Sequence, residues 1–286
     1  MEKIKMTLSM FIFGTIGLFV KYIDAPSSVI AAVRGLAGAV FLIIFCIITK
    51  KLPDMAAVRK NLPLLCISGA AIGINWILLF EAYNYTSVAV ATLCYYMSPV
   101  FVILLSPLVL KEKYTAKKLI CVAVALLGML LVSGVMNGEF PSNPTGIILG
   151  LSAAAVYASI IFMNKKIAGV PAYDKTIIQL FCAFAAVTPY CLLTVSPSDI
   201  NLSGKGIALL MTVGLVHTGI AYLLYFGSMS SLKSHTVAVL SYVDPAVAVI
   251  LSAIVLHEDA GLPGYIGAIL IIGATLFGEL PERKKS

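Results

Sequence analysis

The sequence predicts an all-α integral membrane protein with ten transmembrane helices, arranged as two inverted five-helix repeats. Three observations lead to this fold class: a shortage of charge, a series of long apolar runs, and a motif that recurs in both halves. Of the 286 residues, 12% are charged and 60% are hydrophobic, and the mean hydropathy is +1.01. A soluble domain has about 25% charged residues. The composition therefore excludes a soluble enzyme, a soluble nucleic-acid-binding protein and a disordered chain.

Ten apolar runs are long enough to cross a bilayer, because about 20 helical residues span a hydrocarbon core of about 30 Å. These runs cover approximately residues 5–21, 26–49, 62–82, 87–110, 117–136, 145–165, 173–194, 204–227, 235–256 and 262–280. Strands of a membrane barrel would alternate polar and apolar residues, whereas residues 41–45 are all apolar, so we expect helices. A cleaved signal peptide is the alternative for the first run, but no clear small-x-small cleavage site precedes Pro26.

Lysine and arginine predict the orientation, because they are enriched in cytoplasmic loops. With the N-terminus inside, 17 of the 20 basic residues fall on the cytoplasmic side, Lys21 and Lys205 fall outside, and Arg34 lies within a run. We therefore expect a multi-pass protein of the plasma membrane with both termini in the cytoplasm. The net charge of +7 then reflects orientation, and a nucleic-acid partner loses its support.

Two segments of the chain carry the same residues at the same spacing. In each, a tyrosine is followed three residues later by a proline, and the proline is followed thirteen residues later by a glutamate. The offset between the copies is 146 residues, and it relates Tyr96, Pro99 and Glu112 to Tyr242, Pro245 and Glu258. We interpret the two glutamates, which lie at loop junctions, as structural caps.

The repeat predicts two halves, residues 1–137 and 138–286, with five helices each. Because five is an odd number, the second half crosses the membrane in the opposite sense to the first. Inverted halves can rock about a site near the middle of the membrane and expose it to each side in turn. The repeat therefore indicates a secondary transporter.

The sequence also resembles the drug/metabolite transporter superfamily, and most closely its EamA-type permeases. Besides the repeated proline and glutamate, the matching residues are Pro26, Arg34, Ala82, Tyr83, Gly128 and Gly273. The family usually has a Trp-Gly pair in its first helix, where this chain has Phe13-Gly14. The resemblance covers essentially the whole chain and implies export or uptake of small metabolites, often amino acids. It indicates the kind of transporter and leaves the substrate open.

Two charged residues are predicted to lie deep in the membrane. Asp244 is about ten residues into its run, roughly 15 Å from the end, and Arg34 is roughly 12 Å deep. Such residues are costly in a bilayer and usually face a cavity or a partner. Asp244 is a candidate for proton coupling or for binding a substrate ammonium, or else it caps backbone freed beside Pro245. Arg34 can bind a substrate carboxylate through two parallel hydrogen bonds, or else it has a structural partner.

Pro99 and Pro245 are expected to break their helices, because proline removes a backbone hydrogen bond. The freed carbonyl groups are tolerated at membrane depth where they face a cavity. We therefore expect a cavity with Tyr96 and Tyr242 on opposing walls and Ser241 nearby. A kink needed for packing is the alternative, and both can hold together.

Four further polar or aromatic residues within the runs are weaker substrate-binding candidates: Asn75, Trp76, Gln179 and His217. Each has a structural alternative, because one interhelical hydrogen bond, worth about 0.6 kcal/mol, is the more common role of such a polar residue. Trp76 can stack on a cationic substrate or simply pack between helices.

We expect this transporter to move a small polar metabolite, with an amino acid or a related compound as the leading substrate class, and proton-coupled export as a hypothesis. A multidrug or organic-cation exporter of the same fold is the alternative. An enzyme is not expected, because the chain has neither an HExxH nor a GxSxG motif. We expect no cofactor and no metal, since the six cysteines form no CxxC pair and no GxxxxGK[ST] loop is present. The partners are a small-molecule substrate, the lipid bilayer and, by hypothesis, protons; the oligomeric state is left open.

Overall fold

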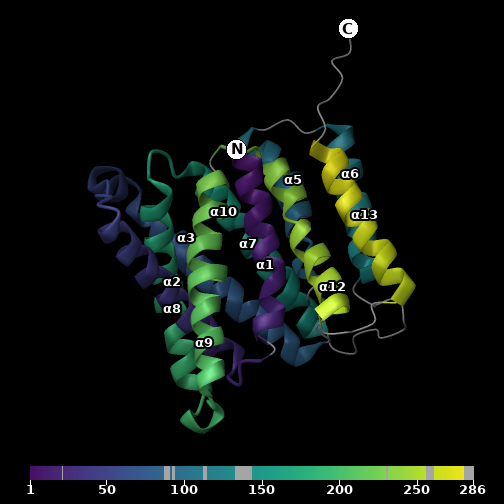
Figure 1. Cartoon of the computed structure of the whole chain (residues 1–286). Coiled ribbons are helices and arrows are strands. Elements are labelled where there is room, and N and C mark those ends of the chain that lie inside the picture. Colours follow the sequence, from purple (N-terminus) through teal and green to yellow (C-terminus); the bar gives the residue numbers. More distant parts are fainter. Residues whose placement is uncertain are drawn as a thin grey trace.

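The computed structural model describes residues 1–20, 22–86, 91, 94–111, 115–132, 144–229, 231–255 and 261–279. In these ranges every regular element is a helix, and most helices run along one common direction (Figure 1). The helices are α1 (Glu2–Val20), α2 (Ser27–Ile48), α3 (Met55–Tyr85), α5 (Ser98–Leu110), α6 (Ala116–Val132), α7 (Pro144–Lys166), α8 (Ala172–Thr194), η2 (Pro197–Asp199), α9 (Gly204–Thr212), η3 (Val213–Ile220), α10 (Ala221–Met229), α11 (Ser234–Leu240), α12 (Val243–Val255) and α13 (Gly261–Glu279). Glu112 and Glu258 lie outside the described residues.

The prediction of an all-helical membrane protein is confirmed, whereas the count of ten spans stays a prediction. Among the described residues, six helical segments are long and apolar enough to cross a membrane, namely α1, α2, α3, α7, α8 and the continuous segment Gly204–Met229. Three further apolar stretches are shorter: Ser98–Leu110, Leu119–Leu131 and Leu262–Ala274. Each predicted run coincides with at least one described helix.

Helix α3 begins at Met55 rather than near residue 62, where its apolar run begins. The side chain of Asp54 accepts a hydrogen bond from the backbone N–H of Ala57, at 3.0 Å, and so caps the first turn. The helix then continues through Pro63. Its start is set by this cap and not by hydropathy, which is why the apolar run underestimated its length.

The segment 204–229 is helical throughout, but it is not one regular α-helix. Between α9 and α10, the eight residues of η3 form a π-helix. The hydroxyl of Thr218 donates to the carbonyl of Val213 within it, at 3.0 Å. Local hydropathy predicts a continuous span here and carries no signal for the change of helix type. Wide turns of this kind occur mostly as short insertions in α-helices.

The two repeated prolines lie at helix starts. Helix α5 begins at Ser98, one residue before Pro99, and α12 begins two residues before Pro245. Proline is well tolerated in a first turn, where its missing N–H would have no helical partner. In the second half a turn at Ser241 and Tyr242 separates α11 from α12. Each proline therefore follows an interruption of its helical segment and does not kink a continuous helix.

Close packing brings α1 against α12 at a glycine. A Cβ atom at Gly14 would lie 2.6 Å from the carbonyl oxygen of Asp244 and 2.7 Å from the Cβ of Val247. No side chain fits at that distance, so a residue larger than glycine would push the two helices apart. The contact holds the first turn of α12 against the middle of α1.

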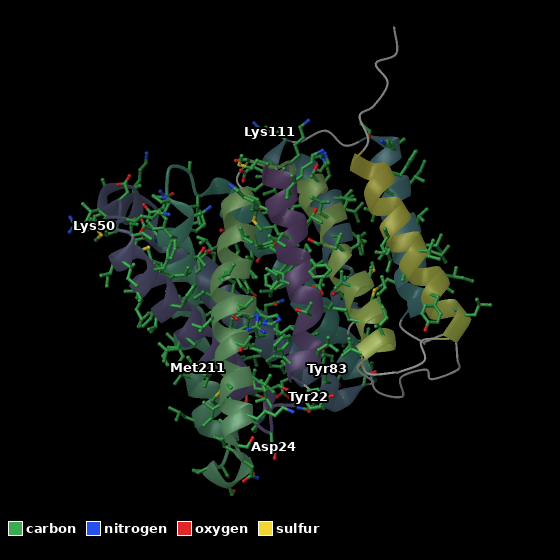
Figure 2. All side chains as sticks on the ribbon, in the orientation of Figure 1. Tyr22, Asp24, Lys50, Tyr83, Lys111 and Met211 are labelled. Carbon is green, nitrogen blue, oxygen red and sulfur yellow. The ribbon has the colours of Figure 1, made fainter. Side chains whose placement is uncertain are left out.

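The ends of the bundle differ in the residues they carry. Lys50 and Lys111 lie at the end where the chain begins, whereas Tyr22, Asp24 and Tyr83 lie at the opposite end (Figure 2). Helix α13 ends on the same side as the N-terminus (Figure 1). We refer below to these as the N-terminal end and the Asp24 end of the bundle.

Candidate functional site

A cavity of about 290 Å³ lies among α1, α2, α3, α5, α7, α10 and α12. It extends from Met10, in the first half of α1, to Ser27, which is exposed at the start of α2 near the Asp24 end. Seven of the residues singled out from the sequence line it: Arg34, Asn75, Trp76, Tyr96, Pro99, Ser241 and Asp244. Residues from distant parts of the chain thus meet around one space.

Arg34 provides the cationic side of the cavity. Its guanidinium carbon lies 4.5 Å from the ring centroid of Trp76, which is a cation–π distance. The side chain of Tyr222 makes polar contacts with both Arg34 and Trp76. The Nε atom of Arg34 is buried and has no hydrogen-bond partner. The guanidinium is thus held in place by aromatic groups while part of its donor capacity is unused.

Asp244 provides the acidic side of the cavity, from the first turn of α12. Its side chain makes a polar contact with Tyr96, which comes from the turn before α5. No ion pair joins Asp244 to Arg34, although both line the same cavity and both are described. The two opposite charges are therefore separated within one space, an arrangement that suits a ligand with two charged ends.

Aromatic rings form a large part of the remaining wall. Phe13 lies edge-on to Tyr222 with ring centroids 5.1 Å apart, and Tyr95 lies 5.6 Å from Tyr157. The hydroxyl oxygens of Tyr157 and Tyr225 are 2.5 Å apart, which ties α7 to α10 behind the wall. Sequence reasoning missed Phe13, Tyr95, Tyr157 and Tyr222 as lining residues. The three tyrosines gave no signal beyond their place in an apolar run, and the chain has 13 tyrosines; Phe13 stands where the family usually has tryptophan, which was not read as a lining position.

Asn75 both lines the cavity and holds it together. Its side-chain nitrogen donates to the backbone carbonyl of Ala153, at 2.6 Å, and so links α3 to α7. Only 3% of the residue is exposed. The structural alternative for Asn75 is thus realised at a position that also borders the cavity.

Two other candidates, Gln179 and His217, do not line the cavity. Gln179 donates through Nε2 to Ser68 Oγ at 2.5 Å and to Asn164 Oδ1 at 3.1 Å, between α3, α7 and α8. His217 lies in η3 with its Nε2 atom 2.8 Å from the hydroxyl of Thr15. Each side chain has a polar partner on a neighbouring helix, while Gln179 Oε1 and His217 Nδ1 are buried without one. These contacts fit the structural alternative for both residues.

Tyr242 and Pro245 lie behind the cavity wall. The ring of Tyr242 stacks on that of Tyr96 at 6.5 Å, and its hydroxyl donates to the backbone carbonyl of Tyr96 at 3.3 Å. Tyr242 is fully buried, so the two tyrosines are neighbours and not opposing walls as the sequence predicted. Ser241, three residues before Asp244, lines the cavity, whereas Tyr242 does not. Asp244 lines the cavity, whereas its neighbour Pro245 does not.

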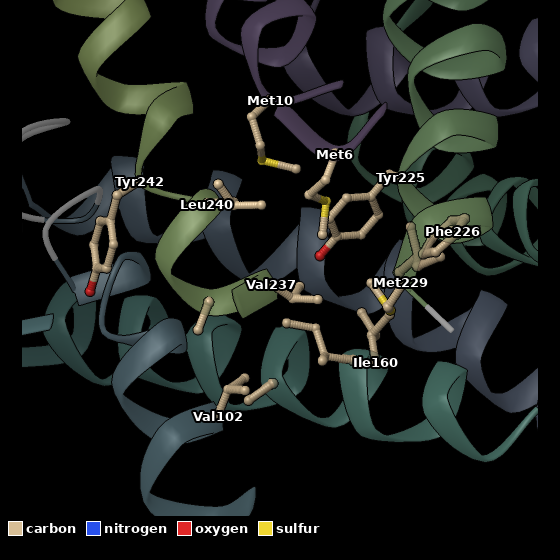
Figure 3. Close-up of a cluster of buried hydrophobic side chains, with 14 of the residues drawn as sticks. Met6, Met10, Val102, Ile160, Tyr225, Phe226, Met229, Val237, Leu240 and Tyr242 are labelled. Atoms are coloured by element: carbon tan, nitrogen blue, oxygen red, sulfur yellow. The ribbon is translucent and has the colours of Figure 1, made fainter. Parts of the chain in front are cut away.

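The lining of the cavity on α1 begins at Met10, and apolar packing lies on the N-terminal side of this residue. Side chains from α1, α5, α7, α10 and α11 meet in a buried cluster there (Figure 3). We call this the closing cluster, and it includes Met6, Met10, Val102, Ile160, Phe226, Met229, Val237 and Leu240. Met10 belongs both to this cluster and to the cavity lining. The cavity is therefore bordered by packed side chains on one side and by an exposed helix start on the other.

Among the described residues, no group of three or more histidine, cysteine, aspartate or glutamate side chains is arranged to hold a metal ion. The side chains that line the cavity offer one guanidinium, one carboxyl group, one amide, hydroxyl groups and aromatic rings. This set can bind and orient a small charged molecule.

Known proteins resemble this chain in sequence or in fold. The chain is 28% identical over 271 residues to the "Uncharacterized transporter YxxF" of Bacillus subtilis (strain 168), covering 94% of this chain and 86% of that protein. It is 24% identical to "Protein PecM" of Dickeya dadantii (strain 3937), covering 90% and 84%. A crystal structure matches with a TM-score of 0.85 over 97% of this chain and 96% of the other, at 19% identity, and shows the fold alone.

A family description matches the chain twice. The profile of the EamA-like transporter family covers residues 3–134 and again residues 144–278. Together the two matches cover most of the chain. They leave out the segment between them and a few residues at each end. The resemblance seen in the sequence is confirmed: this chain belongs to the EamA-like transporter family, and it is a membrane transporter.

Proposed function

We propose that the protein is a secondary transporter that moves a small zwitterionic metabolite, an amino acid or a related compound, across the plasma membrane by alternating access. The observation that carries this proposal is the cavity itself. Arg34 and Asp244 line it without forming an ion pair, and aromatic residues contact both of them. A ligand with both a carboxylate and an ammonium group satisfies both charges at once.

Each charge suits one end of such a ligand. The guanidinium of Arg34, with its buried and unpartnered Nε atom, matches the planar geometry of a carboxylate. Asp244 and the faces of Tyr95 and Tyr96 suit an ammonium group, through charge and cation–π attraction. The cavity of about 290 Å³ is at the small end of the range for ligand pockets, about 300–1,000 Å³. Its size favours a metabolite over a bulky drug.

The packing of the helices supports the inverted repeat of residues 1–137 and 138–286. Each predicted span of the first half can be exchanged with the span five places later in the second half. After this exchange, each pair of packed helices named here corresponds to another packed pair or to itself. The contact of α1 with α12 then corresponds to that of α7 with α5, and the contact of α3 with α8 corresponds to that of η3 with α2. The α2–α8 and α6–α13 pairs map onto themselves. Such pseudo-symmetry is what an inverted repeat produces.

The shape of the cavity supports alternating access. It reaches the exposed start of α2 near the Asp24 end, and the closing cluster blocks the N-terminal end. With the orientation predicted from lysine and arginine, this conformation is accessible from outside and closed to the cytoplasm. Rocking of the two halves would separate the closing cluster and close the outer side.

Asp244 is also our proposed proton-coupling group. A carboxyl group in the cavity wall, in polar contact with Tyr96, can hold a proton in one conformation and release it in another. A proton or a substrate ammonium would then neutralise the same group, so that their binding is competitive. This competition couples the movement of one to that of the other.

The proposal is tested by a ligand screen on the purified chain. Amino acids, nucleosides, sugars and quaternary amines are compared by thermal shift, because a ligand at 100 times its Kd stabilises the folded state by about 2.7 kcal/mol. Since Trp76 is the single tryptophan and lies against Arg34, its fluorescence reports binding in the cavity. We expect amino acids to raise Tm and to change this fluorescence. Stabilisation by quaternary amines alone would contradict the proposal and favour the organic-cation exporter.

A further inference from the structure

A second, larger cavity lies away from the central one, at the N-terminal end of the bundle. It is a groove of about 670 Å³ between the end of α2, the connection of residues 49–54, the start of α3 and the start of α8. It shares no lining residue with the central cavity. Nothing in the proposed transport cycle accounts for it.

The floor of the groove is apolar and its rim is basic. Aliphatic side chains from three helices form the floor: Ile43, Ile47, Met55, Val58, Ile177 and Ile178. Lys50 and Lys51 line the groove where α2 ends. Ile47 is 71% exposed, so the floor continues into the outer surface of α2. An apolar channel that opens towards the lipid and ends at two cations suits a molecule with a long apolar part and an anionic head.

The backbone at the end of α2 positions the two lysines. Lys50 has a φ of 53°, a left-handed conformation that is uncommon for residues other than glycine. The backbone N–H of Lys51 then donates to the carbonyl of Cys46 at 2.9 Å, which closes the last turn. The Lys51 ammonium lies 5.1 Å from the ring centroid of Phe45 and 5.4 Å from that of Tyr173. The groove thus has one cation held by aromatic rings and a second beside it.

The acidic residue in the groove is already engaged. Asp174 also lines it, is 5% exposed, and accepts a hydrogen bond from the backbone N–H of Asp54 at 3.0 Å. Its carboxyl group forms no ion pair with Lys50 or Lys51. The two lysines therefore keep their charge for an anion at the rim, and the carboxyl group disfavours an anion deeper in the groove. This charge pattern favours an anionic head group at the rim of the groove and an apolar chain along its floor.

The position of the groove indicates which amphipathic anion occurs there. Lys50 lies at the same end of the bundle as the N-terminus (Figure 2), and sequence orientation assigns this end to the cytoplasm. The cytoplasmic leaflet carries anionic lipids, and basic pockets between helices on that side bind their head groups. We propose that the groove binds an anionic glycerophospholipid, with its phosphate between Lys50 and Lys51 and an acyl chain along Ile43, Ile47 and Ile177.

The experiment compares lipids on the delipidated protein by native mass spectrometry. Phosphatidylglycerol and phosphatidylcholine with identical acyl chains are titrated against wild type, the double variant Lys50→Gln/Lys51→Gln and the variant Lys117→Gln. Lys117 is a matched control, because it belongs to α6 and its ammonium also lies over an aromatic ring, 4.8 Å from the centroid of Phe277. We expect wild type and Lys117→Gln to prefer phosphatidylglycerol about tenfold, and the double variant to lose the preference.

A conservative variant separates loss of charge from loss of fold. Lys50→Arg/Lys51→Arg keeps both cations and should keep the preference for phosphatidylglycerol, whereas binding of phosphatidylcholine should be equal in all variants that fold. Equal affinity of wild type for the two lipids would overturn the proposal, and so would a preference that survives Lys50→Gln/Lys51→Gln. Transport is not the readout, so the result is independent of the function proposed for the central cavity.

Discussion

Two polar regions inside the bundle differ in what their residues can reach. In the central cavity, Arg34 and Asp244 border open space and form no ion pair with each other. Between α3, α7 and α8, Gln179 donates to Ser68 and Asn164, is fully buried and borders no described cavity. From the sequence all three were polar residues in apolar runs. The difference teaches that access to a cavity, and not polarity within the membrane, separates candidate binding groups from packing groups.

The largest expected effect comes from Asp244→Asn, which removes the titratable group and keeps its size. In proteoliposomes, accumulation of substrate driven by a pH gradient should be abolished, while exchange of labelled for unlabelled substrate continues once the substrate concentration is raised to offset the lost contact between Asp244 and the ammonium group. Exchange shows that the variant is folded and can still alternate. Asp199→Asn, in the connection after α8, is the control and should transport like wild type. Undiminished proton-driven flux in Asp244→Asn would disprove the coupling.

A smaller effect is expected for Arg34→Gln, measured as ligand affinity through Trp76 fluorescence. A hydrogen bond to a charged group contributes about 1.5–3 kcal/mol, so the Kd for an amino acid should rise about 10- to 100-fold. The Kd for an analogue that lacks the carboxylate should change little. An equal rise in Kd for both ligands would mean that Arg34 only maintains the shape of the cavity. Arg34 would then be a packing group like Gln179.

The smallest effect is expected for Gln179→Leu, because this side chain does not reach the cavity. Each interhelical hydrogen bond is worth about 0.6 kcal/mol, so Tm should fall by a few degrees at most. The Kd and the transport rate should stay at their wild-type values. A 10-fold rise in Kd with unchanged Tm would show that Gln179 belongs to the binding site after all.

Local sequence predicted the helices well where only burial in lipid mattered. Helix α2 follows its apolar run within a residue at each end, because hydropathy is a property of the residues themselves. Helix α3 is longer than its run because a cap at Asp54 starts it. The π-helix η3 was not predicted, since it depends on how residues 213–220 pack and not on their hydropathy.

Prediction of the site was limited by the same distinction. The predicted depth in the membrane led to Arg34 and Asp244, and the repeated proline led to Tyr96 and Ser241. All four residues line the cavity. The sequence could not distinguish these four lining residues from His217, which does not line the cavity, because all five lie in apolar runs. It also could not select Tyr222 from the 13 tyrosines, since lining depends on which helix faces which.

The sequence by itself determined that this protein is a helical membrane transporter of the EamA-like family, and it predicted two related halves, because charge content, hydropathy and motif spacing are visible along the chain. The tertiary structure decided that Arg34 and Asp244 share one cavity and that Gln179 does not reach it. It also revealed the groove beside Lys50 and Lys51. The physical reason is that cavities are left between helices distant in sequence, and only the packing of those helices determines where they lie.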